Sequence, residues 1–276
     1  MARSIVALNR ALRRLRRGGK IALVPTMGAL HKGHVALIGQ ARRRAPRVIV
    51  SLFVNPAQFG PNEDFASYPR AFERDLAVLA SLEVDLVWAP TVEVMYPRGF
   101  ATSLVPAGAA TAGLEDKFRP QFFAGVATVV AKLFTQCRPD IAVFGEKDFQ
   151  QLKVVTRMAR DLDLPVRVIG VPTVREPDGL ALSSRNVRLS REERAVAPAL
   201  HRVLADCAQK ISSGAPIATV MAQGRQALGQ AGFAVDYLEA RHAETLMPVA
   251  SAADGPIRLL VAARLGTTRL IDNLGV

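Results

Sequence analysis

The fold is decided by residues 21–41, which read Ile21-Ala-Leu-Val-Pro25-Thr-Met-Gly28-Ala-Leu-His31-Lys-Gly33-His34-Val-Ala-Leu-Ile38-Gly-Gln-Ala41. An apolar run gives way to Pro and Gly and then to apolar residues at helical spacing, which predicts a strand, a tight loop and the start of a helix. A helix N-terminus carries unsatisfied N–H groups and suits an anion such as phosphate. Two imidazoles at that point, His31 and His34, add donors for phosphate oxygens.

Two other interpretations of this histidine pair compete with a phosphate site. A zinc site would need further ligands, and neither a Cys-x-x-Cys pair nor a nearby third ligand accompanies the histidines. Lone histidines on a surface loop are also common. The segment carries neither the Gly-Lys-Ser/Thr of a Walker loop nor a Gly-x-Gly-x-x-Gly fingerprint. We therefore favour a nucleotide-phosphate site that uses neither of the common glycine loops.

Composition is that of a globular protein with a basic balance. The 276 residues predict one large or two ordinary domains, and half of the residues are apolar. The 36 Lys and Arg residues exceed the 24 Asp and Glu residues, which gives a formal charge of +12. We interpret this charge as spread along the chain with one cluster, Arg10–Lys20, where Leu12 and Leu15 are spaced to bury one face of a surface helix.

The same sequence argues against nucleic-acid binding, a transmembrane segment and secretion. It contains no aromatic stacking series or zinc-finger signature for nucleic-acid binding. No apolar run approaches the ~20 residues of a transmembrane helix, and the basic N-terminus lacks the apolar core of a signal peptide. The two cysteines, Cys137 and Cys207, fit reduced thiols in the cytosol. We expect a soluble cytoplasmic protein with no nucleic-acid or membrane partner.

Strand and helix patterns alternate through the first two thirds of the chain. The expected strands are Ile21–Val24, Arg47–Val54, Val84–Trp88, Asp140–Phe144 and Val166–Val171. The expected helices are Val35–Arg44, Ala71–Leu82, Val126–Gln136 and Gln150–Leu162. The strands are short and almost wholly apolar, as is typical when helices cover both faces of a sheet. The alternation predicts an α/β fold with a Rossmann-like parallel sheet.

The pattern changes from about Glu176. A helix is expected over Arg191–Ile211, because Ser190 and Glu193 form a capping-box signature, and another helix near Ile217–Leu228. The strand-like runs that follow are Val235–Ala240, Ile257–Ala262 and Thr268–Ile271. We predict a first domain over 1–175 and a smaller α+β domain over 176–276, joined through Pro172–Ser190.

Three further polar loops lie where a parallel sheet collects ligands, beyond the carboxyl ends of its strands. The loop after the second strand is long and holds Asn55 and Gln58, whose amides suit a carboxylate or hydroxyl. Its aromatic residues, Phe59, Phe65 and Tyr68, argue against disorder, and a packed surface loop is the alternative.

The other two loops offer phosphate ligands. In the first, Gly145–Gln151, Lys147 supplies a point charge, although Glu146 and Asp148 could instead pair with it on a solvated helix start. In the second, Ser183-Ser184-Arg185 offers two hydroxyls and a guanidinium, with an ordinary loop as the alternative. All four loops together indicate ATP chemistry.

These motifs resemble the pantothenate synthetases, also called pantoate–β-alanine ligases, within the HxGH nucleotidylyltransferase superfamily. The matching stretches are 25–34, 53–60, 68–70, 144–151, 183–186, 235–238 and 260–264, which cover the whole chain in order. The resemblance implies an ATP- and Mg²⁺-dependent ligase of pantothenate biosynthesis. It would join (R)-pantoate to β-alanine through pantoyl adenylate and release AMP and pyrophosphate. It also implies a cytoplasmic homodimer with a Rossmann-like domain and a C-terminal α+β lid.

The resemblance also implies roles for individual residues. The catalytic groups would be His31, His34, Lys147 and Arg185, with His34 as the proton donor. The ATP site would be lined by Met27, Gly28, Ala29, Leu30, His31, Lys32, Gly33, His34, Gly145, Glu146, Lys147, Asp148, Val174, Leu182, Ser183, Ser184 and Arg185. The substrate site would use Gln58, Gln151, Asn55 and Tyr68, and the metal site would use Asp75.

Two positions depart from the family pattern, since Leu182 stands where methionine is usual and Phe149 replaces a frequent tyrosine. Two other functions stay open at this point. One is a different adenylyl- or cytidylyltransferase, which would keep the mononucleotide in its product. The other is a basic nucleic-acid-binding protein, which would bind in a salt-dependent way.

Overall fold

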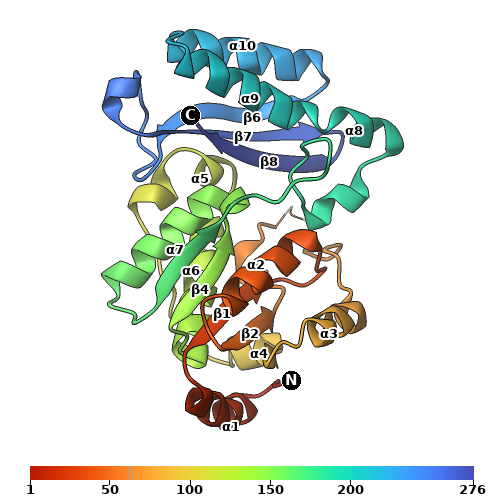
Figure 1. Ribbon diagram of the computed structural model, residues 1–276, viewed down its shortest axis with the longest axis vertical. Helices are drawn as coiled ribbons and strands as arrows, with labels where there is room; N and C mark the ends of the chain where they lie inside the picture. Colours follow the sequence, from red (N-terminus) through yellow and green to blue (C-terminus); the bar gives the residue numbers. More distant parts are fainter. Residues whose placement is uncertain (62, 64) are drawn as a thin grey trace. The chain divides into compact units, whose positions relative to one another are not determined.

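The computed structural model describes residues 1–61, 63 and 65–276, and these form two compact units (Figure 1). The first unit contains Met1–Glu146 and Gln151–Pro172. The second unit contains Thr173–Val276 together with the short segment Lys147–Gln150. A parallel sheet with helices in one unit and a small antiparallel sheet in the other confirm the predicted α/β class.

The first unit is built on a five-stranded parallel sheet in the order β3-β2-β1-β4-β5. Its strands are β1 Ile21–Thr26, β2 Arg47–Leu52, β3 Leu86–Trp88, β4 Ile141–Gly145 and β5 Arg167–Val171. All five expected strands are therefore present, with ends that differ by a residue or two. The strand order reverses between β1 and β4, and open α/β sheets bind ligands outside the carboxyl ends of the strands at such a point.

Helices cover both faces of this sheet. On one face, Leu8 and Leu12 of α1 share a core with Val126 of α6 and Val155 of α7. On the other face, α2 and α3 pack their apolar residues against the strands. The helices of this unit are α1 Ile5–Leu15, α2 Lys32–Arg42, α3 Phe72–Ser81, α4 Val92–Met95, α5 Glu115–Phe118, α6 Phe122–Cys137 and, apart from its first two residues, α7 Phe149–Asp161. Turns of 3-10 helix are η1 Arg16–Gly18, η2 Pro56–Gln58, η3 Gly108–Thr111 and η4 Glu146–Asp148, of which only Glu146 in η4 belongs to this unit.

The register between β1 and β2 aligns the starts of two polar loops. Thr26, the last residue of β1, is paired with Leu52, the last residue of β2. The Thr26 hydroxyl also donates to the carbonyl of Ser51 at 2.7 Å. The loops that follow these two strands therefore begin side by side.

The second unit is an antiparallel sheet in the order β6-β7-β8 with two long helices packed on it. Its strands are β6 Ala234–His242, β7 Ile257–Leu265 and β8 Thr268–Gly275. Its helices are α8 Arg191–Val196, α9 Ala199–Ser212 and α10 Ile217–Gln230, and its 3-10 turns are η5 Ser184–Arg188 and η6 Ala252–Asp254. The capping box predicted for Ser190 and Glu193 is present at the start of α8.

The prediction of one continuous helix over Arg191–Ile211 is wrong. The segment forms α8 and α9, which are separated at Ala197 and Pro198. Proline has no N–H to donate, and its ring collides with the carbonyl of the preceding turn, so the chain breaks there and starts a new helix. Near the N-terminus, the predicted surface helix is present but starts earlier, at Ile5; it buries Leu8 as well as the predicted Leu12, and Leu15 is partly buried against the same core.

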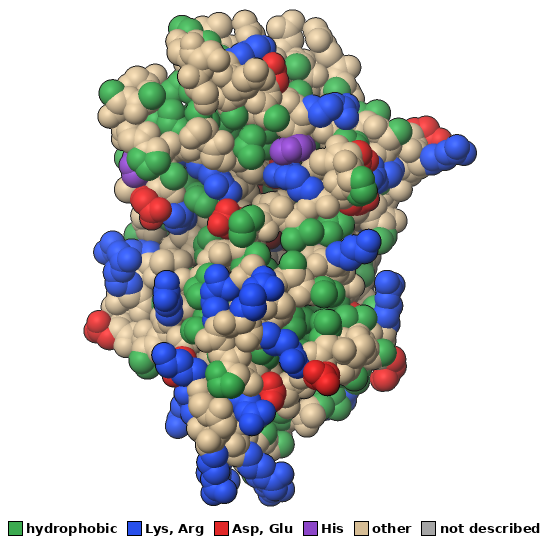
Figure 2. Space-filling model, in the orientation of Figure 1, with side chains coloured by type: hydrophobic (Ala, Val, Ile, Leu, Met, Phe, Trp, Pro, Cys, Tyr) green, Lys and Arg blue, Asp and Glu red, His purple; other side chains and the backbone are tan. Residues whose placement is uncertain are grey.

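The interpretation that the basic charge is spread along the chain is also wrong. Residues 1–62 contain 12 Lys and Arg and no Asp or Glu, whereas the 24 basic and 24 acidic residues of the remainder cancel. The whole excess therefore lies in the segment that forms α1, β1, α2 and β2. Lys and Arg side chains are dense around α1 (Figure 2).

Both cysteines are buried within helices, Cys137 at the end of α6 and Cys207 in α9. Burial raises the pKa of the Cys137 thiol to about 12, so this thiol stays protonated and unreactive. No helix formed by the described residues has the length and apolarity to span a bilayer.

Candidate active site

The loop between β1 and α2 holds the two histidines in a reciprocal cap of the helix. The Nδ1 atom of His31 accepts the N–H of Gly33 at 3.1 Å, and the Nδ1 atom of His34 accepts the N–H of His31 at 3.2 Å. The two ring centroids lie 4.1 Å apart. Because Nδ1 accepts in both rings, the hydrogen of each neutral ring is assigned to Nε2. The cap thus fixes two Nε2–H donors at a helix N-terminus, where anions are favoured.

The backbone ahead of this cap takes an unusual path. Gly28 has φ +83° and Ala29 has φ +51°, both in the left-handed region. The N–H groups of Ala29 and Leu30 donate to the two carboxylate oxygens of Asp75, each at 2.8 Å. Asp75 lies on α3 and is 2% exposed. The residue predicted as a metal ligand is therefore placed as a partner of the loop backbone.

The described part of the chain also lacks a cluster of side chains that could hold a metal ion. Residues 1–61, 63 and 65–276 contain no group of three or more His, Cys, Asp or Glu side chains arranged to hold a metal ion. The zinc interpretation of His31 and His34 therefore has no third ligand among these residues.

The loop after β2 brings Gln58 next to the β1 loop. The Nε2 atom of Gln58 lies 3.2 Å from the sulfur of Met27, and its Oε1 atom accepts from Nδ2 of Asn55 at 3.1 Å. Gln58 is buried at the end of η2. The Gln58 amide and the Met27 thioether are both uncharged, so they can orient a polar substrate through hydrogen bonds without forming an ion pair with it.

The amide of Asn55 is fully used inside the fold. Its oxygen accepts from the N–H of Ala57 at 3.2 Å and from the hydroxyl of Tyr96 at 2.7 Å. Its nitrogen donates to Gln58 and to the carbonyl of Gly125, the latter at 3.2 Å. Burial raises the pKa of Tyr96 to about 12, so its hydroxyl remains a donor. Four bonds saturate this amide, and its geometry suits holding Gln58 in place.

Close packing against α6 fixes η2. A Cβ on Gly125 would lie 2.1 Å from the carbonyl oxygen of Ala57, so only glycine allows this approach. Arg119 donates to the carbonyl of Gln58 at 3.3 Å and forms a bond of 2.7 Å with Glu63. Tyr68, a predicted substrate residue, is buried, and its ring meets Phe59 edge-on at 5.7 Å.

Gly145 ends β4, and the loop that follows passes from Glu146 in the first unit to Lys147 in the second. The Lys147 ammonium lies 3.8 Å from a carboxylate oxygen of Asp148, whose side chain is 45% exposed. This is the ion pair that the alternative interpretation expected. At 3.8 Å, with Asp148 open to solvent and the Lys147 side chain 20% exposed, this pair is weak enough for a phosphate to replace Asp148 as the partner of the ammonium.

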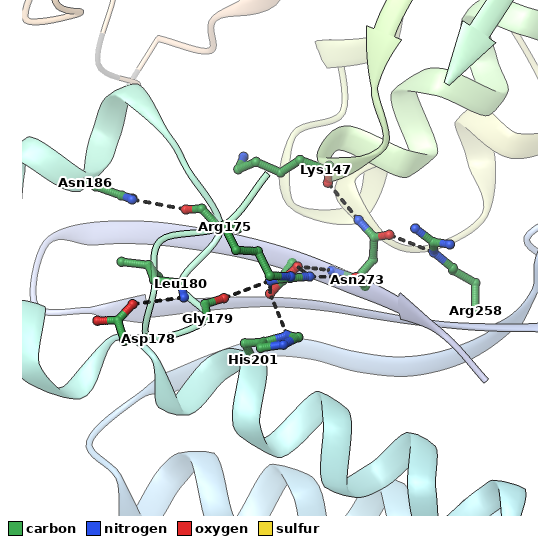
Figure 3. Close-up of polar contacts among 11 residues, drawn as sticks. Lys147, Arg175, Asp178, Gly179, Leu180, Asn186, His201, Arg258 and Asn273 are labelled. Atoms are coloured by element: carbon green, nitrogen blue, oxygen red, sulfur yellow. Dashed lines mark hydrogen bonds and ion pairs between the residues drawn. The ribbon is translucent and has the colours of Figure 1, made fainter. Parts of the chain in front are cut away.

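Strands of the second unit hold the backbone of Lys147 (Figure 3). The Lys147 carbonyl accepts from Nδ2 of Asn273 at 2.9 Å, and Oδ1 of Asn273 accepts from Nε of Arg258 at 2.7 Å. The Arg258 guanidinium lies over the ring of Phe149, 4.2 Å from its centroid. Asn273 is 2% exposed, so its amide has no competing water. The contact therefore ties Lys147 to β7 and β8.

A hairpin at the start of the second unit gathers another set of predicted ATP residues. The N–H of Leu182 donates to the carbonyl of Val174 at 2.9 Å. Gly179 turns the chain with φ +93°, and a Cβ there would lie 2.7 Å from His201. After the hairpin, the Ser183 hydroxyl caps η5 by accepting the N–H of Arg185 at 3.2 Å.

Arg175 fastens this hairpin to β8 (Figure 3). It donates two bonds to Asp272 at 2.6 and 2.9 Å and one to the carbonyl of Gly179 at 3.0 Å. His201 Nδ1 lies 3.7 Å from the same carboxylate. Burial and the nearby Arg175 lower the pKa of His201, against the opposing effect of Asp272. The histidine is therefore neutral at pH 7.

The predicted site residues are divided between the two units. In the first unit, Met27–His34, Asn55 and Gln58 lie together through the contacts above, and half-buried Gln151 lies on α7. In the second unit, Val174 and Leu182–Arg185 share the hairpin, and Lys147 and Asp148 lie in the segment held by β8.

Residues that support the site were missed by sequence reasoning, namely Tyr96, Gly125, Arg175, Arg258 and Asn273. Gly125 carried a usable signal, because a glycine inside a helix is unfavourable unless another backbone approaches it. The other four act through contacts that no local pattern encodes.

Comparisons with known proteins agree on one family. The sequence model of the family described as "Pantoate-beta-alanine ligase" matches residues 1–275. A "Pantothenate synthetase" of Nitrobacter hamburgensis is 64% identical, over 100% of this chain and 98% of that protein. A "Pantothenate synthetase 2" of Bradyrhizobium diazoefficiens has the same identity and coverage.

Solved structures show the same similarity in three dimensions. The crystal structure of a pantothenate synthetase from Thermus thermophilus has a TM-score of 0.94 and 51% identity, covering 99% of this chain and 98% of that one. A pantoate–β-alanine ligase from Francisella tularensis, crystallised with "Beta-gamma ATP and Beta-alanine", has a TM-score of 0.83 and 34% identity, covering 99% and 96%.

Proposed function

This chain belongs to the pantoate–β-alanine ligase family, and from that premise we propose how its residues use ATP to join pantoate to β-alanine. The pantoate carboxylate attacks the α-phosphorus of ATP, which gives pantoyl adenylate and releases pyrophosphate. The β-alanine amine then attacks the acyl carbon, and AMP leaves with the former carboxylate oxygen. No nucleophile of the protein is needed in either step.

The first step requires donors for negative charge that builds on the α-phosphate and the leaving pyrophosphate. His31 and His34 serve as hydrogen-bond donors through the Nε2–H of a neutral ring. The proton-donor role that the family resemblance implies for His34 is met here as hydrogen-bond donation, because a neutral imidazole does not release its Nε2 proton. Lys147 and Arg185 supply positive charge, and Ser183 and Ser184 supply hydroxyls. Gly145, Glu146, Asp148, Val174 and Leu182 complete the nucleotide site in this proposal.

The second step requires that the acid and the amine be oriented rather than protonated. Gln58 and Gln151 bind pantoate through their amides, and Gln58 also meets β-alanine. Tyr68 closes the substrate side, whereas Asn55 acts by holding Gln58, because its own amide is saturated. The second unit, from Thr173 onward, acts as a lid that keeps water from the adenylate.

The family resemblance also implies Mg²⁺, a homodimer and a cytoplasmic location. The oxygens of Asp75 already bind two backbone N–H groups, so this residue does not fit a magnesium site and we route no step through the ion. We carry the homodimer over as a proposal that analytical ultracentrifugation tests. The two buried free thiols support a reducing compartment.

The observation that carries the proposal is the reciprocal histidine cap, which leaves both rings with hydrogen on Nε2. Two substitutions separate the cap from the donor. His34→Asn places an amide oxygen where Nδ1 accepts but removes the Nε2–H, so the fold should stay intact while kcat falls about 10²–10³-fold, the usual loss for one such donor. His34→Gln places an amide near Nε2 but removes the cap, so it should retain more activity and lose thermal stability.

The assay incubates the full chain with ATP, Mg²⁺, pantoate and β-alanine and quantifies the products. We expect AMP, pyrophosphate and pantothenate in equal amounts. A product that keeps the mononucleotide would indicate a nucleotidyltransferase instead. Salt-dependent binding of RNA or DNA without turnover would support the nucleic-acid alternative. Normal turnover by His34→Asn would remove His34 from the mechanism.

A further inference from the structure

Asp75 has surroundings that suit a different role from the one that family resemblance implied. Its Oδ2 atom accepts the N–H of Ala29 and its Oδ1 atom accepts the N–H of Leu30, both at 2.8 Å. The side chain is 2% exposed, so water competes with neither bond. Hydrogen bonds to an ionised carboxylate are roughly twice as strong as neutral ones. Asp75 therefore accepts hydrogen bonds from two consecutive backbone N–H groups of a loop that lies 45 residues away in sequence.

Magnesium does not suit this carboxylate. Mg²⁺ demands near-octahedral oxygen ligands and usually keeps several of its waters. A side chain that is 2% exposed gives those waters no room, and both oxygens already accept backbone bonds. The described residues around it supply no set of three metal-ligating side chains either.

The backbone conformation of the loop between β1 and α2 has to be stabilised by residues outside the loop. Ala29 has φ +51°, a backbone conformation that residues other than glycine rarely adopt. Such a conformation persists only where the surrounding structure imposes it. Gly28, with φ +83°, has no room for a side chain, because a Cβ would lie 2.9 Å from Oδ2 of Asp75. The residue that follows Leu30 is His31, whose N–H and ring form the start of the histidine cap of α2. The position of that cap thus depends on the peptide units that Asp75 holds.

We propose that Asp75 is a positioning residue: it acts as an internal anion that imposes the left-handed conformation of Gly28 and Ala29 and so places the donors of His31 and His34. The part of this inference that concerns ATP rests on the proposed function. The part that concerns the loop backbone does not, and the two are measured separately.

The first experiment compares Asp75→Asn with Glu73→Gln, which removes an exposed carboxylate from the same helical turn. The Asn amide keeps the size of the side chain but points N–H at one of the two loop N–H groups. We expect faster amide hydrogen exchange at Ala29 and Leu30 and a fall of about 10²-fold in kcat/KM for ATP, the loss that a 1 Å misplacement produces. The half-saturating Mg²⁺ concentration should stay unchanged, and Glu73→Gln should behave like the unmodified chain.

A rescue sharpens this result. Glycine adopts a left-handed conformation without strain, so Ala29→Gly should reduce the dependence of the loop on Asp75. In the Ala29→Gly background, we expect Asp75→Asn to cost several-fold less activity than it does alone. An equal loss in both backgrounds would contradict a role through the backbone of Ala29.

The unmodified chain gives a test that does not depend on the folding of any variant. Mg²⁺ added without ATP should leave the amide exchange of Ala29 and Leu30 unchanged, because Asp75 remains bound to both. Exchange that changes on addition of Mg²⁺, or a raised half-saturating Mg²⁺ concentration in Asp75→Asn with the amides still protected, would overturn the inference in favour of a metal ligand. If the chain proves inactive as a ligase, the exchange measurements still decide the backbone role.

Discussion

Gly125→Ala is the substitution that most sharply tests how packing against α6 holds Gln58 and η2 in place. The added Cβ would lie 2.1 Å from the carbonyl oxygen of Ala57 and 2.7 Å from Cα of Gln58, whereas ordinary contacts begin at 3.4 Å. Helix α6 and η2 must therefore separate by about 1 Å, an overpacking that typically costs about 1–3 kcal/mol of stability. Gln58 moves with η2, and a 1 Å misplacement of a positioning group costs about 10²-fold in rate.

The assay follows pyrophosphate release with ATP, pantoate and β-alanine, beside thermal unfolding and calorimetric titration with ATP. We expect a lowered Tm and a kcat/KM for pantoate reduced about 10²-fold, with ATP affinity retained because the β1 loop is not displaced. Gly39→Ala is the matched control, since this helical glycine has no atom within 4 Å of an added Cβ. It should stabilise the fold by about 0.5–1 kcal/mol and leave kinetics unchanged. Unaltered pantoate kinetics in a folded Gly125→Ala would refute the reasoning.

Three further predictions follow from other contacts. Gln58→Ala should raise KM for pantoate and for β-alanine while ATP affinity holds; equal weakening of all three ligands, measured by titration and kinetics, would argue against its assignment. Asn273→Ala removes the donor to the Lys147 carbonyl and should raise KM for ATP with pantoate binding unchanged; an unchanged KM for ATP would show that β8 does not place Lys147. In the folded chain the pKa of His201 is lowered from 6.5, so the unfolded chain takes up a proton first as the pH falls. The stability that neutral His201 contributes above pH 6.5 is therefore lost below it. Tm should therefore drop between pH 7 and about pH 5, and less so in His201→Gln, as differential scanning calorimetry would show.

Much of the fold was predictable because a buried parallel sheet leaves a strong local pattern. Its strands are nearly continuous apolar runs, and the polar loops fall after them because ligands gather at carboxyl ends. The break between α8 and α9 was predictable too, since Pro198 cannot continue a helix. The reciprocal roles of His31 and His34 required coordinates, because the capping box known from sequence uses Ser or Thr with Glu or Gln.

The supporting contacts could not be predicted, because they join residues that are distant in sequence. Asp75 meets the β1 loop across 46 positions, and Asn273 meets Lys147 across 126. A carboxylate beside a nucleotide loop suggests a metal ligand until its two backbone donors are seen. Asn55 likewise offers an amide to a substrate until its four internal bonds are known.

The path of one oxygen atom tests the central claim most directly. Pantoate labelled with ¹⁸O in its carboxylate is turned over with ATP and β-alanine, and the AMP and phosphate products are analysed by mass spectrometry. Attack of the carboxylate on the α-phosphorus predicts one ¹⁸O in AMP for each pantothenate formed. Label in inorganic phosphate with ADP as the nucleotide product, or AMP without label, would contradict the adenylate route.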